Sequence, residues 1–294
     1  MPGASFMRLF PLTLICMLFF SLNSILCRFA LGTWDMEPLT YTAIRDLSAA
    51  VMLGTICAFS ALTGTKGGKR HIWKRVMEQS SWKGAALLFL YMLTFSLSYT
   101  AIPSAVGTLI LNVAVQVSMI GLGLMSGMRP GRPQIIGLLL AFTGVAFLLL
   151  PGVSAPSPLH ALLMGMSGVF WGAYCLCGRR TSSAQLATSG NFLRSVPMGL
   201  TAAMAAFILE NTPSLPALTC AVLAGAVASG LGYTLWYALV PRYSILGASV
   251  VQLSIPPITA VLGAILLAEP ITMRLVFCTL LILGGILLTL KPRA

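Results

Sequence analysis

The sequence predicts an all-α membrane protein whose ten transmembrane helices form two inverted five-helix repeats. Three observations support this prediction: a scarcity of charge, ten apolar runs, and an internal repeat over an odd number of helices. Hydrophobic residues make up 57% of the 294 residues and charged residues only 8%, whereas a soluble domain carries about 25% charged residues. So few charges cannot cover a water-facing surface, and lipid is therefore the expected solvent.

Each of the ten apolar runs approaches the length of about 20 residues that a transmembrane helix needs. Prolines lie between most of them, where the chain must turn. The predicted helices span residues 8–31, 38–62, 84–102, 103–126, 133–151, 158–178, 187–209, 217–240, 244–267 and 272–290. The first run follows Arg8, as in a signal peptide, but no small-x-small cleavage site comes after it. We therefore interpret it as the first membrane helix.

The charges alternate between the two sets of loops. Most of the 18 basic residues, against six acidic ones, fall on one side of the predicted topology. The loops of the other side hold the acidic residues Asp35, Glu37, Glu210 and Glu269. The positive-inside rule then predicts an integral, multi-pass protein of a bacterial cytoplasmic (inner) membrane, with both termini cytoplasmic. The net charge of +12 is too dispersed for a nucleic-acid footprint, so we expect no nucleic-acid partner.

The longest loop, residues 63–83, combines basic residues with Trp73 and Trp82. One interpretation is that it lies on the anionic inner leaflet of the membrane. The other is a solvated basic loop that fixes the topology.

An internal repeat divides the chain into two domains, residues 1–151 and 152–294. A shift of 140 residues aligns the last two helices of each domain, and a slightly larger shift aligns the earlier ones. The matched pairs include Gly107 with Gly247, Pro130 with Pro270, Phe20 with Trp171, and Arg45 with Arg194. Because five is odd, the second copy enters the membrane from the opposite side, as in the inverted repeats of many secondary transporters.

Several motifs resemble those of one known family. They are Trp171-Gly172 followed by Arg179, Pro38 then Arg45, the stretch from Gly247 to Pro256-Pro257, and Ala268-Glu269-Pro270 ahead of Gly284-Gly285. These features resemble the drug/metabolite transporter superfamily, in its EamA branch with two EamA domains, over nearly the whole chain. The first copy departs from the pattern, with Phe20-Ser21 for Trp-Gly, Gln116 for a proline and Met128-Arg129 for the acidic residue.

The resemblance implies ten helices around a central cavity between the halves. It also implies a transporter, most often an exporter of metabolites or amino acids. Relatives that exchange sugar phosphates or nucleotide sugars leave the substrate class open.

Two predicted helices carry polar faces, and polar groups inside a bilayer are informative because they are costly. The first face holds Thr108, Asn112 and Gln116, and the second holds Ser249, Gln252, Pro256 and Thr259. The 140-residue shift brings Asn112 onto Gln252, so the two amides are expected near the membrane centre. We expect both faces to line the substrate cavity. The alternative is that the amides join helices by hydrogen bonds worth about 0.6–2 kcal/mol.

Aromatic and charged residues add further candidates. Tyr99, Trp171, Tyr174 and Tyr233 are expected in the same cavity, where rings could stack on a substrate, although such residues also form interfacial belts. Asp46 is the one candidate carboxylate for proton coupling. The alternative for Asp46 is a structural pair, for example with Arg28, with Arg45 and Asp46 reaching the outer surface by snorkelling.

Enzymatic signatures are absent from the sequence. It contains no G-x-S-x-G, H-E-x-x-H or Walker motif, so we expect no catalysis, cofactor or metal. We predict a secondary active transporter that exports small metabolites such as amino acids by alternating access. Its partners are a small-molecule substrate, the lipid bilayer, and a proton or counter-substrate. The alternatives are a sugar-phosphate or nucleotide-sugar exchanger, and a membrane subunit or receptor without transport. The oligomeric state is not predicted.

Overall fold

A computed structural model describes residues 3–63, 68–125, 131–150, 156–178, 181–207, 212–242 and 251–289. The regular elements of these residues are all helical. The first half contains α1 (Gly3–Arg28), the π-helical η1 (Phe29–Thr33), α2 (Pro38–Thr63), α3 (Gly68–Gln79), α4 (Trp82–Tyr99), α5 (Ser104–Met125) and α6 (Arg132–Leu149). The second half contains α7 (Pro158–Gly178), α8 (Ala184–Phe207), α9 (Leu215–Leu223), the π-helical η2 (Ala224–Leu231), α10 (Gly232–Leu239), the 3-10 turn η3 (Val240–Arg242), α12 (Ile255–Leu267) and α13 (Met273–Thr289).

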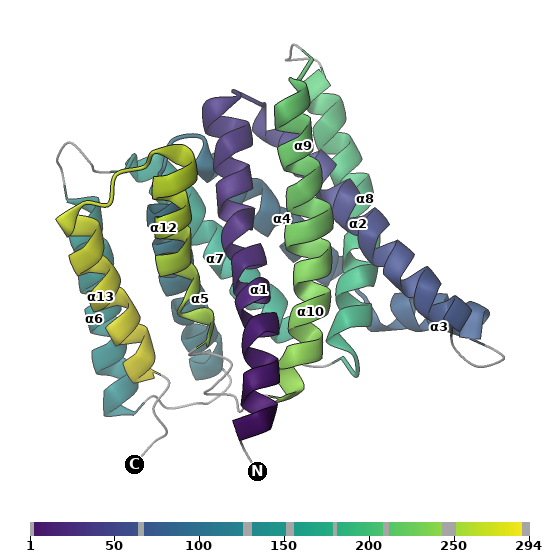
Figure 1. The fold of residues 1–294 in the computed structure, drawn as a ribbon, viewed down its shortest axis with the longest axis horizontal. Helices are drawn as coiled ribbons and strands as arrows, with labels where there is room; N and C mark the ends of the chain where they lie inside the picture. The colour runs from purple at the N-terminus through teal and green to yellow at the C-terminus, as the bar shows by residue number, and fades with distance from the viewer. Residues whose placement is uncertain are drawn as a thin grey trace.

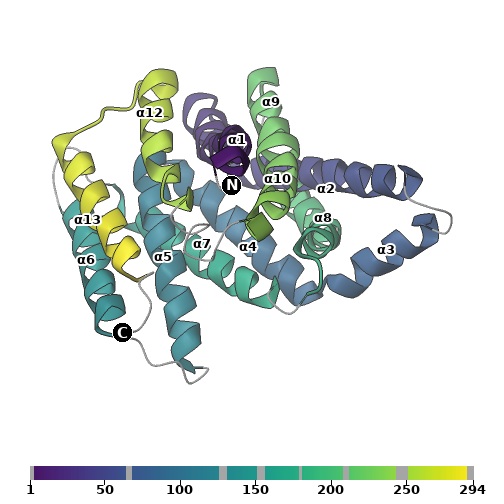
Figure 2. The same ribbon diagram turned by 60° about the horizontal axis from the view of Figure 1, so that its bottom comes forward.

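The helices form a bundle in which successive long segments run up and down (Figure 1). We call the side where α1 begins and α13 ends the proximal side, and the opposite side the distal side. Elements far apart in sequence lie side by side: α6 packs along α13, α2 along α8, and α7 between α4 and α5. Figure 2 shows α3 extending away from the bundle beside the end of α2.

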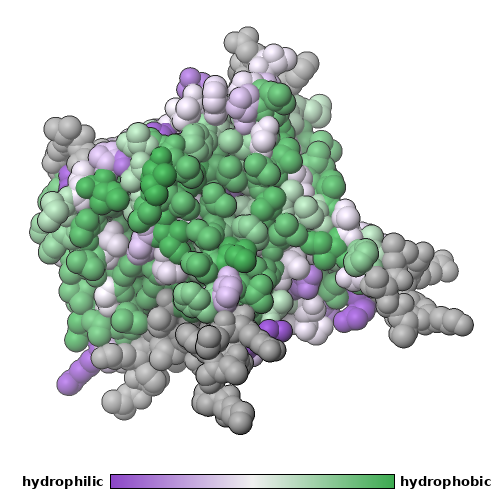
Figure 3. All heavy atoms as spheres, in the orientation of Figure 1, coloured by the Kyte–Doolittle hydropathy of each residue, from purple (hydrophilic) through white to green (hydrophobic). Residues whose placement is uncertain are grey.

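The outer surface of this bundle is suited to lipid. Five helical spans among the described residues are long and apolar enough to cross a membrane. They are Phe10–Thr33, Pro38–Ala61, Arg132–Leu149, Pro158–Gly178 and Leu215–Leu239, and three shorter apolar helices accompany them. Figure 3 shows a mainly hydrophobic face with hydrophilic residues toward its upper and lower margins. The protein is therefore an integral, multi-pass membrane protein, because such a surface requires lipid around it.

Each predicted range overlaps helical structure, and prolines account for several boundaries. Pro38 and Pro158 are the first residues of their helices, and α6, α9 and α12 each have a proline in their first two positions. The missing N–H of proline costs nothing there, since the first N–H groups of a helix have no partner within it.

In three predicted segments the structure shows local features that were not predicted. The predicted loop 63–83 contains the amphipathic helix α3, in which Val76 is buried while Trp73, Lys74 and Arg75 are exposed. The predicted helix 217–240 contains a π-helical stretch at η2. The predicted helix 244–267 is interrupted by a turn at residues 253–254, because the Pro256-Pro257 pair lacks the N–H donors needed to continue a helix through this point.

Candidate functional site

An aromatic cluster from four helices occupies the middle of the bundle. Trp171 of α7 stacks on Tyr233 of α10, with ring centroids 5.5 Å apart and an angle of 19° between the ring planes. Phe20 of α1 lies 5.8 Å from Tyr233, and Tyr91 of α4 lies 4.9 Å from Trp171. Phe20 and Trp171 are also partners in the sequence repeat. The centre of the bundle is therefore built from both halves of the chain.

Two cavities meet at this cluster. The larger one, which we call the proximal cavity, has a volume of about 350 Å³ and reaches Gln79, Ser81 and Thr181 at the proximal ends of the helices. The smaller one, the inner cavity, has a volume of about 110 Å³ and lies deeper in the bundle. Both are lined by Phe20, Trp171, Tyr233 and Gln252. The two cavities thus follow one path from the proximal side to the centre, with aromatic rings at their junction.

The predicted amide residues lie at the inner cavity. Asn112 of α5 and Gln252 both line it, as does Thr108. The Asn112 side chain donates a hydrogen bond to the Thr108 carbonyl, 2.8 Å away within its own helix. That bond does not join two helices, and Asn112 keeps its side-chain oxygen for other partners.

Trp171 and Tyr233 line both cavities, and Tyr174 lines the proximal one. The hydroxyl of Tyr174 is 2.8 Å from that of Thr188, which is in turn 2.8 Å from the hydroxyl of Tyr237. This chain of hydroxyls gives one wall of the proximal cavity a polar strip in an otherwise apolar surface.

Three other predicted residues, Tyr99, Thr259 and Gln116, do not line either cavity. Tyr99 is fully buried, and its hydroxyl donates to the Ser104 carbonyl at 3.0 Å. Thr259 is also fully buried and bonds to the Ile255 carbonyl of its own helix. Gln116 is partly buried and does not line either cavity. Ser249 lies outside the described residues.

On the distal side lies a polar cluster that we call the distal lock. Glu269 accepts hydrogen bonds from the backbone N–H of Ser104, at 2.9 and 3.0 Å, and from its hydroxyl at 2.6 Å. Arg28 lies 3.7 Å from the Glu269 carboxylate and donates to the carbonyls of Tyr99 and Thr100. A carboxylate at the first residue of α5 is favourable, because a helix N-terminus attracts negative charge. The lock joins both halves of the chain.

A left-handed residue places Glu269 in the lock. Ala268 ends α12 with φ 52° and ψ 29°, and the Glu269 N–H donates to the Gly263 carbonyl at 3.1 Å. This is the capping geometry in which glycine is usually found, and alanine is strained there. The Ala268-Glu269-Pro270 motif thus has a structural meaning: it turns the chain so that the carboxylate meets α5.

The buried charges of α2 correct two predictions. Arg45 and Asp46 are both fully buried, so neither snorkels to the surface of the protein. Asp46 accepts a 2.6 Å hydrogen bond from the Ser195 hydroxyl of α8, and Arg28 is engaged in the distal lock instead of pairing with Asp46. Adjacent residues of a helix point about 100° apart, which explains why Arg45 faces α4 while Asp46 faces α8.

Sequence reasoning missed Phe20, Asn23, Asn191 and the lock. The repeat aligns Phe20 with Trp171 and so indicates a place for Phe20 in the cavity, although Phe20-Ser21 departs from the Trp-Gly of the family pattern. Asn191 lines the proximal cavity and accepts from the Ser81 N–H at 2.9 Å. No local pattern could have paired Ser104 with Glu269, because 165 residues separate them. Among the described residues, no group of three His, Cys, Asp or Glu side chains could hold a metal ion.

The chain is similar to proteins already known. The sequence model of the EamA-like transporter family matches residues 159–291. An uncharacterized protein of Pseudomonas aeruginosa is 40% identical over 286 residues, 97% of this chain and 96% of that protein. A protein of Archaeoglobus fulgidus described as an uncharacterized transporter is 26% identical over 272 residues, 88% of this chain and 90% of that protein. One solved crystal structure shares the fold, with a TM-score of 0.64, 18% identity and coverage of 95% of each chain.

Proposed function

Because this chain belongs to the EamA-like transporter family, we propose that it is a secondary active transporter, an exporter of small metabolites such as amino acids, working by alternating access. The observation that carries the proposal is the path described above. It begins at the proximal side, narrows at Phe20, Trp171 and Tyr233, and ends short of the distal lock. A path that reaches the centre of the bundle from one side is expected for a transporter that works by alternating access.

The packing of the helices supports the inverted repeat. With ten spans, α6 corresponds to α13 and α2 to α8, and each of these helices packs on its own counterpart. The contact of α4 with α7 likewise has a counterpart in the contact of α1 with η2 and α10. A twofold axis parallel to the membrane plane produces such reciprocal contacts. Alternating access would then exchange the proximal opening for the distal one by moving one half against the other.

The charges support an orientation with the proximal side in the cytoplasm. Exposed basic residues are found at the proximal ends of the helices, namely Lys74, Arg75, Lys83, Arg132 and Arg242. On the distal side, Arg28 is held by Glu269 and two carbonyls, and Arg274 donates to carbonyls of residues 147 and 150. In this orientation both termini would be cytoplasmic, as the positive-inside rule favours, and the proximal cavity would open toward the cytoplasm.

The lining residues favour small uncharged or zwitterionic substrates. Neither cavity is lined by Lys, Arg, Asp or Glu within the described part of the chain. A sugar-phosphate exchanger needs cations facing the cavity to hold the phosphate dianion. The absence of such cations from the two cavities favours an amino-acid exporter over a sugar-phosphate or nucleotide-sugar exchanger.

Proton coupling through Asp46 forms part of the proposal. One carboxylate oxygen of Asp46 accepts from Ser195 and the other has no hydrogen-bond partner. The charged group nearest to it in sequence is Arg45 on its own helix, and α8 presents Ser195 and Gly199 to it. A buried carboxylate with a vacant oxygen is suited to carry a proton.

Transport is tested with purified protein in proteoliposomes. We expect saturable counterflow of at least one labelled L-amino acid, and an imposed pH gradient should drive net uptake in the native protein but not in Asp46→Asn. Absence of saturable uptake for amino acids, sugar phosphates and nucleotide sugars alike would favour a membrane subunit or receptor without transport.

The cavity is tested with Asn112→Leu and Gln252→Leu. Each change replaces an amide at the inner cavity by an apolar group of similar size, so we expect a loss of flux of at least about tenfold, as for one polar contact. Gln185→Leu on α8 is the matched control, since Gln185 does not line either cavity. Folded yield is measured for all three. Normal flux in both cavity variants would exclude this site.

A further inference from the structure

Arg45 of α2 is a buried cation without a hydrogen-bond partner. Its side chain is fully buried, and all three guanidinium nitrogens lack a hydrogen-bond partner. A buried guanidinium normally has its five N–H donors satisfied by a carboxylate or by carbonyls, because an unpaired buried charge is strongly unfavourable. The donors of Arg45 are therefore free to bind a group that arrives from outside the chain.

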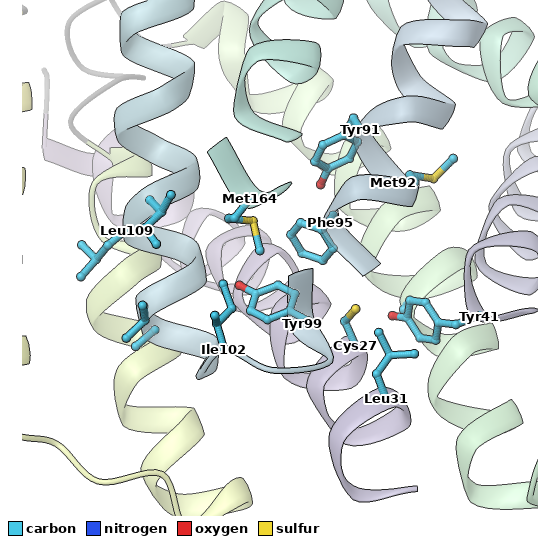
Figure 4. Close-up of a cluster of buried hydrophobic side chains, with 14 of the residues drawn as sticks. Cys27, Leu31, Tyr41, Tyr91, Met92, Phe95, Tyr99, Ile102, Leu109 and Met164 are labelled. Carbon is cyan, nitrogen blue, oxygen red and sulfur yellow. The ribbon is translucent and has the colours of Figure 1, made fainter. Parts of the chain in front are cut away.

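The surroundings of Arg45 point toward the inner cavity. Its guanidinium carbon lies 5.1 Å from the ring centroid of Phe95 and 5.6 Å from that of Tyr91. Tyr91 and Phe95 both line the inner cavity. Figure 4 shows these two rings one above the other along α4, followed by Tyr99. Only one layer of aromatic side chains thus separates the guanidinium from the path that enters at the proximal side.

Two further buried polar atoms without a hydrogen-bond partner come from elements around the same region. The side-chain oxygen of Asn23 on α1 and the hydroxyl of Ser229 on η2 are both buried without a hydrogen-bond partner. Asn23 lines the inner cavity, and Ser229 follows Ala228, which also lines it. Buried polar groups are almost always satisfied in folded proteins. The unsatisfied side chains of Arg45, Asn23 and Ser229 are consistent with a polar ligand that supplies the missing hydrogen bonds.

The backbone of Arg45 is held firmly in place. A Cβ atom on Gly225 of η2 would come within 2.2 Å of the Arg45 carbonyl and 2.0 Å of the Ser48 hydroxyl. Only glycine allows η2 and α2 to approach so closely. The contact also involves a π-helical stretch, a feature that often marks functional sites. The backbone of Arg45 is thus fixed by its contact with η2, while the Tyr91 and Phe95 rings can still change rotamer.

We propose that Arg45 is the carboxylate-binding residue of the substrate site. A substrate that reaches the inner cavity displaces the Tyr91 and Phe95 rings by side-chain rotation, and its carboxylate receives the paired N–H donors of Arg45. This inference rests on the proposed transport function and specifies the chemistry of its substrate. The planar fork of arginine matches a carboxylate in two-point contact.

A carboxylate fits better than a phosphate dianion. Arg45 is a single cation, and Asp46 beside it in the sequence already brings a carboxyl group into the same region. A monoanion neutralises Arg45, whereas a dianion would leave uncompensated negative charge in a buried site. The faces of Trp171 and Tyr233 could hold an ammonium group at the other end of a zwitterion.

The experiment measures binding to the purified protein in detergent, independently of flux. The probes are L-phenylalanine, L-leucine and L-threonine, each compared with its own carboxamide, and glucose 6-phosphate as the phosphate. Apparent Kd values come from the dependence of the melting temperature on probe concentration. We expect at least one amino acid to bind about 10- to 100-fold more tightly than its carboxamide, the range for a hydrogen-bonded charged group.

Three variants assign that preference to Arg45. Arg45→Gln should abolish the preference for acid over amide, and Arg45→Lys should keep it at a reduced level. Arg194→Gln is the matched control, because Arg194 also lies over an aromatic ring, 5.3 Å from that of Trp82, but bonds to Ser80 and the Met77 carbonyl. It should keep the full preference. If Arg45→Gln does not fold, the inference is still tested by the ratio of acid to carboxamide Kd values, measured in the native protein and in Arg45→Lys.

The contrary outcomes are distinct from failure of the transport proposal. Equal binding of acids and amides, no binding of any of the three acids, tighter binding of glucose 6-phosphate, or an acid preference that survives in Arg45→Gln would each overturn the inference. Saturable flux of a compound without a carboxylate would preserve transport and reject the role of Arg45. Arg45-dependent binding of an acid without flux of any compound would reject transport instead.

Discussion

Arg28 and Arg45 are both arginines inside the helical bundle, but their surroundings differ completely. Arg28 donates to the carbonyls of Tyr99 and Thr100 at 3.0 and 2.8 Å and lies 3.7 Å from the Glu269 carboxylate. Arg45 is more deeply buried and has no hydrogen-bond partner. The bonds of Arg28 join α1, α4 and the segment after α12, so it contributes to the packing of the distal side. Arg45 contributes no comparable link.

This contrast indicates that a structural charge differs from a ligand-binding one in its hydrogen-bond and ion-pair partners, and not in how deeply its side chain is buried. The cost of burying a cation must be offset within the protein or by something it binds. For Arg28 the protein supplies the compensation, which makes the residue part of the fold. For Arg45 the nearest compensation comes from aromatic faces, which are weaker partners than carboxylates.

The largest expected effect comes from removing the acid of the distal lock. Glu269→Ala leaves the Ser104 N–H and Arg28 without their carboxylate, so the free energy of unfolding should fall by about 2–3 kcal/mol. Reversible unfolding in mixed micelles measures this change.

Glu78→Ala is the control for this prediction. Glu78 lies 3.8 Å from Lys74 in an exposed pair on α3, and such surface pairs are worth about 0.5 kcal/mol or less. If both variants lost the same small amount, the lock would be an incidental surface contact, and its contrast with Arg45 would disappear.

The fold was largely predictable because lipid imposes a simple rule on sequence. Apolar runs of helical length and the prolines between them place most of the helices, since both act locally along the chain. The turn at residues 253–254 and the π-helix η2 were not predicted, although Pro256-Pro257 and the glycines of η2 were visible. Their effects depend on close packing against other helices, as the Gly225 contact shows.

The candidate site was predictable only in part. Asn112 and Gln252 were placed on polar faces by helical spacing, and both line the inner cavity. Thr259, on the same predicted face, is instead fully buried, and its hydroxyl donates to the Ile255 carbonyl of its own helix. The turn at residues 253–254 interrupts the helical spacing from which Thr259 and Gln252 were predicted to share a face. The partners of Arg28 and the isolation of Arg45 involve residues from distant parts of the chain. Spacing along one helix contains no information about them.

A smaller effect is expected from removing one hydroxyl near the distal lock. Tyr99→Phe loses the 3.0 Å hydrogen bond to the Ser104 carbonyl and the 3.2 Å contact with the Thr108 hydroxyl. The free energy of unfolding should fall by about 1 kcal/mol, the usual worth of such a bond. Binding preferences should not change, since Tyr99 does not line either cavity.

Tyr41→Phe makes the same chemical change near Arg45 and serves as the matched comparison. The Tyr41 hydroxyl points toward the Cys27 thiol in Figure 4 and makes no hydrogen bond to a nitrogen or oxygen atom. A thiol is only a weak partner, so stability should change by no more than about 0.5 kcal/mol. A larger loss in Tyr41→Phe than in Tyr99→Phe would reverse the contrast between the two regions.

A small effect on stability is also expected from removing the fully buried charge of Arg45. Arg45→Met keeps an unbranched side chain in place and removes a cation without hydrogen-bond partners, so the unfavourable transfer of charge is relieved. The lost contacts with the Tyr91 and Phe95 rings cost about 0.5–2 kcal/mol and roughly cancel that gain. We therefore expect unfolding in mixed micelles to differ from the native protein by less than about 1 kcal/mol. Binding of carboxylates should be lost in the same preparation. A loss of stability as large as that of Glu269→Ala would mean that Arg45, like Arg28, is a structural residue, and the site for a carboxylate would have to lie elsewhere.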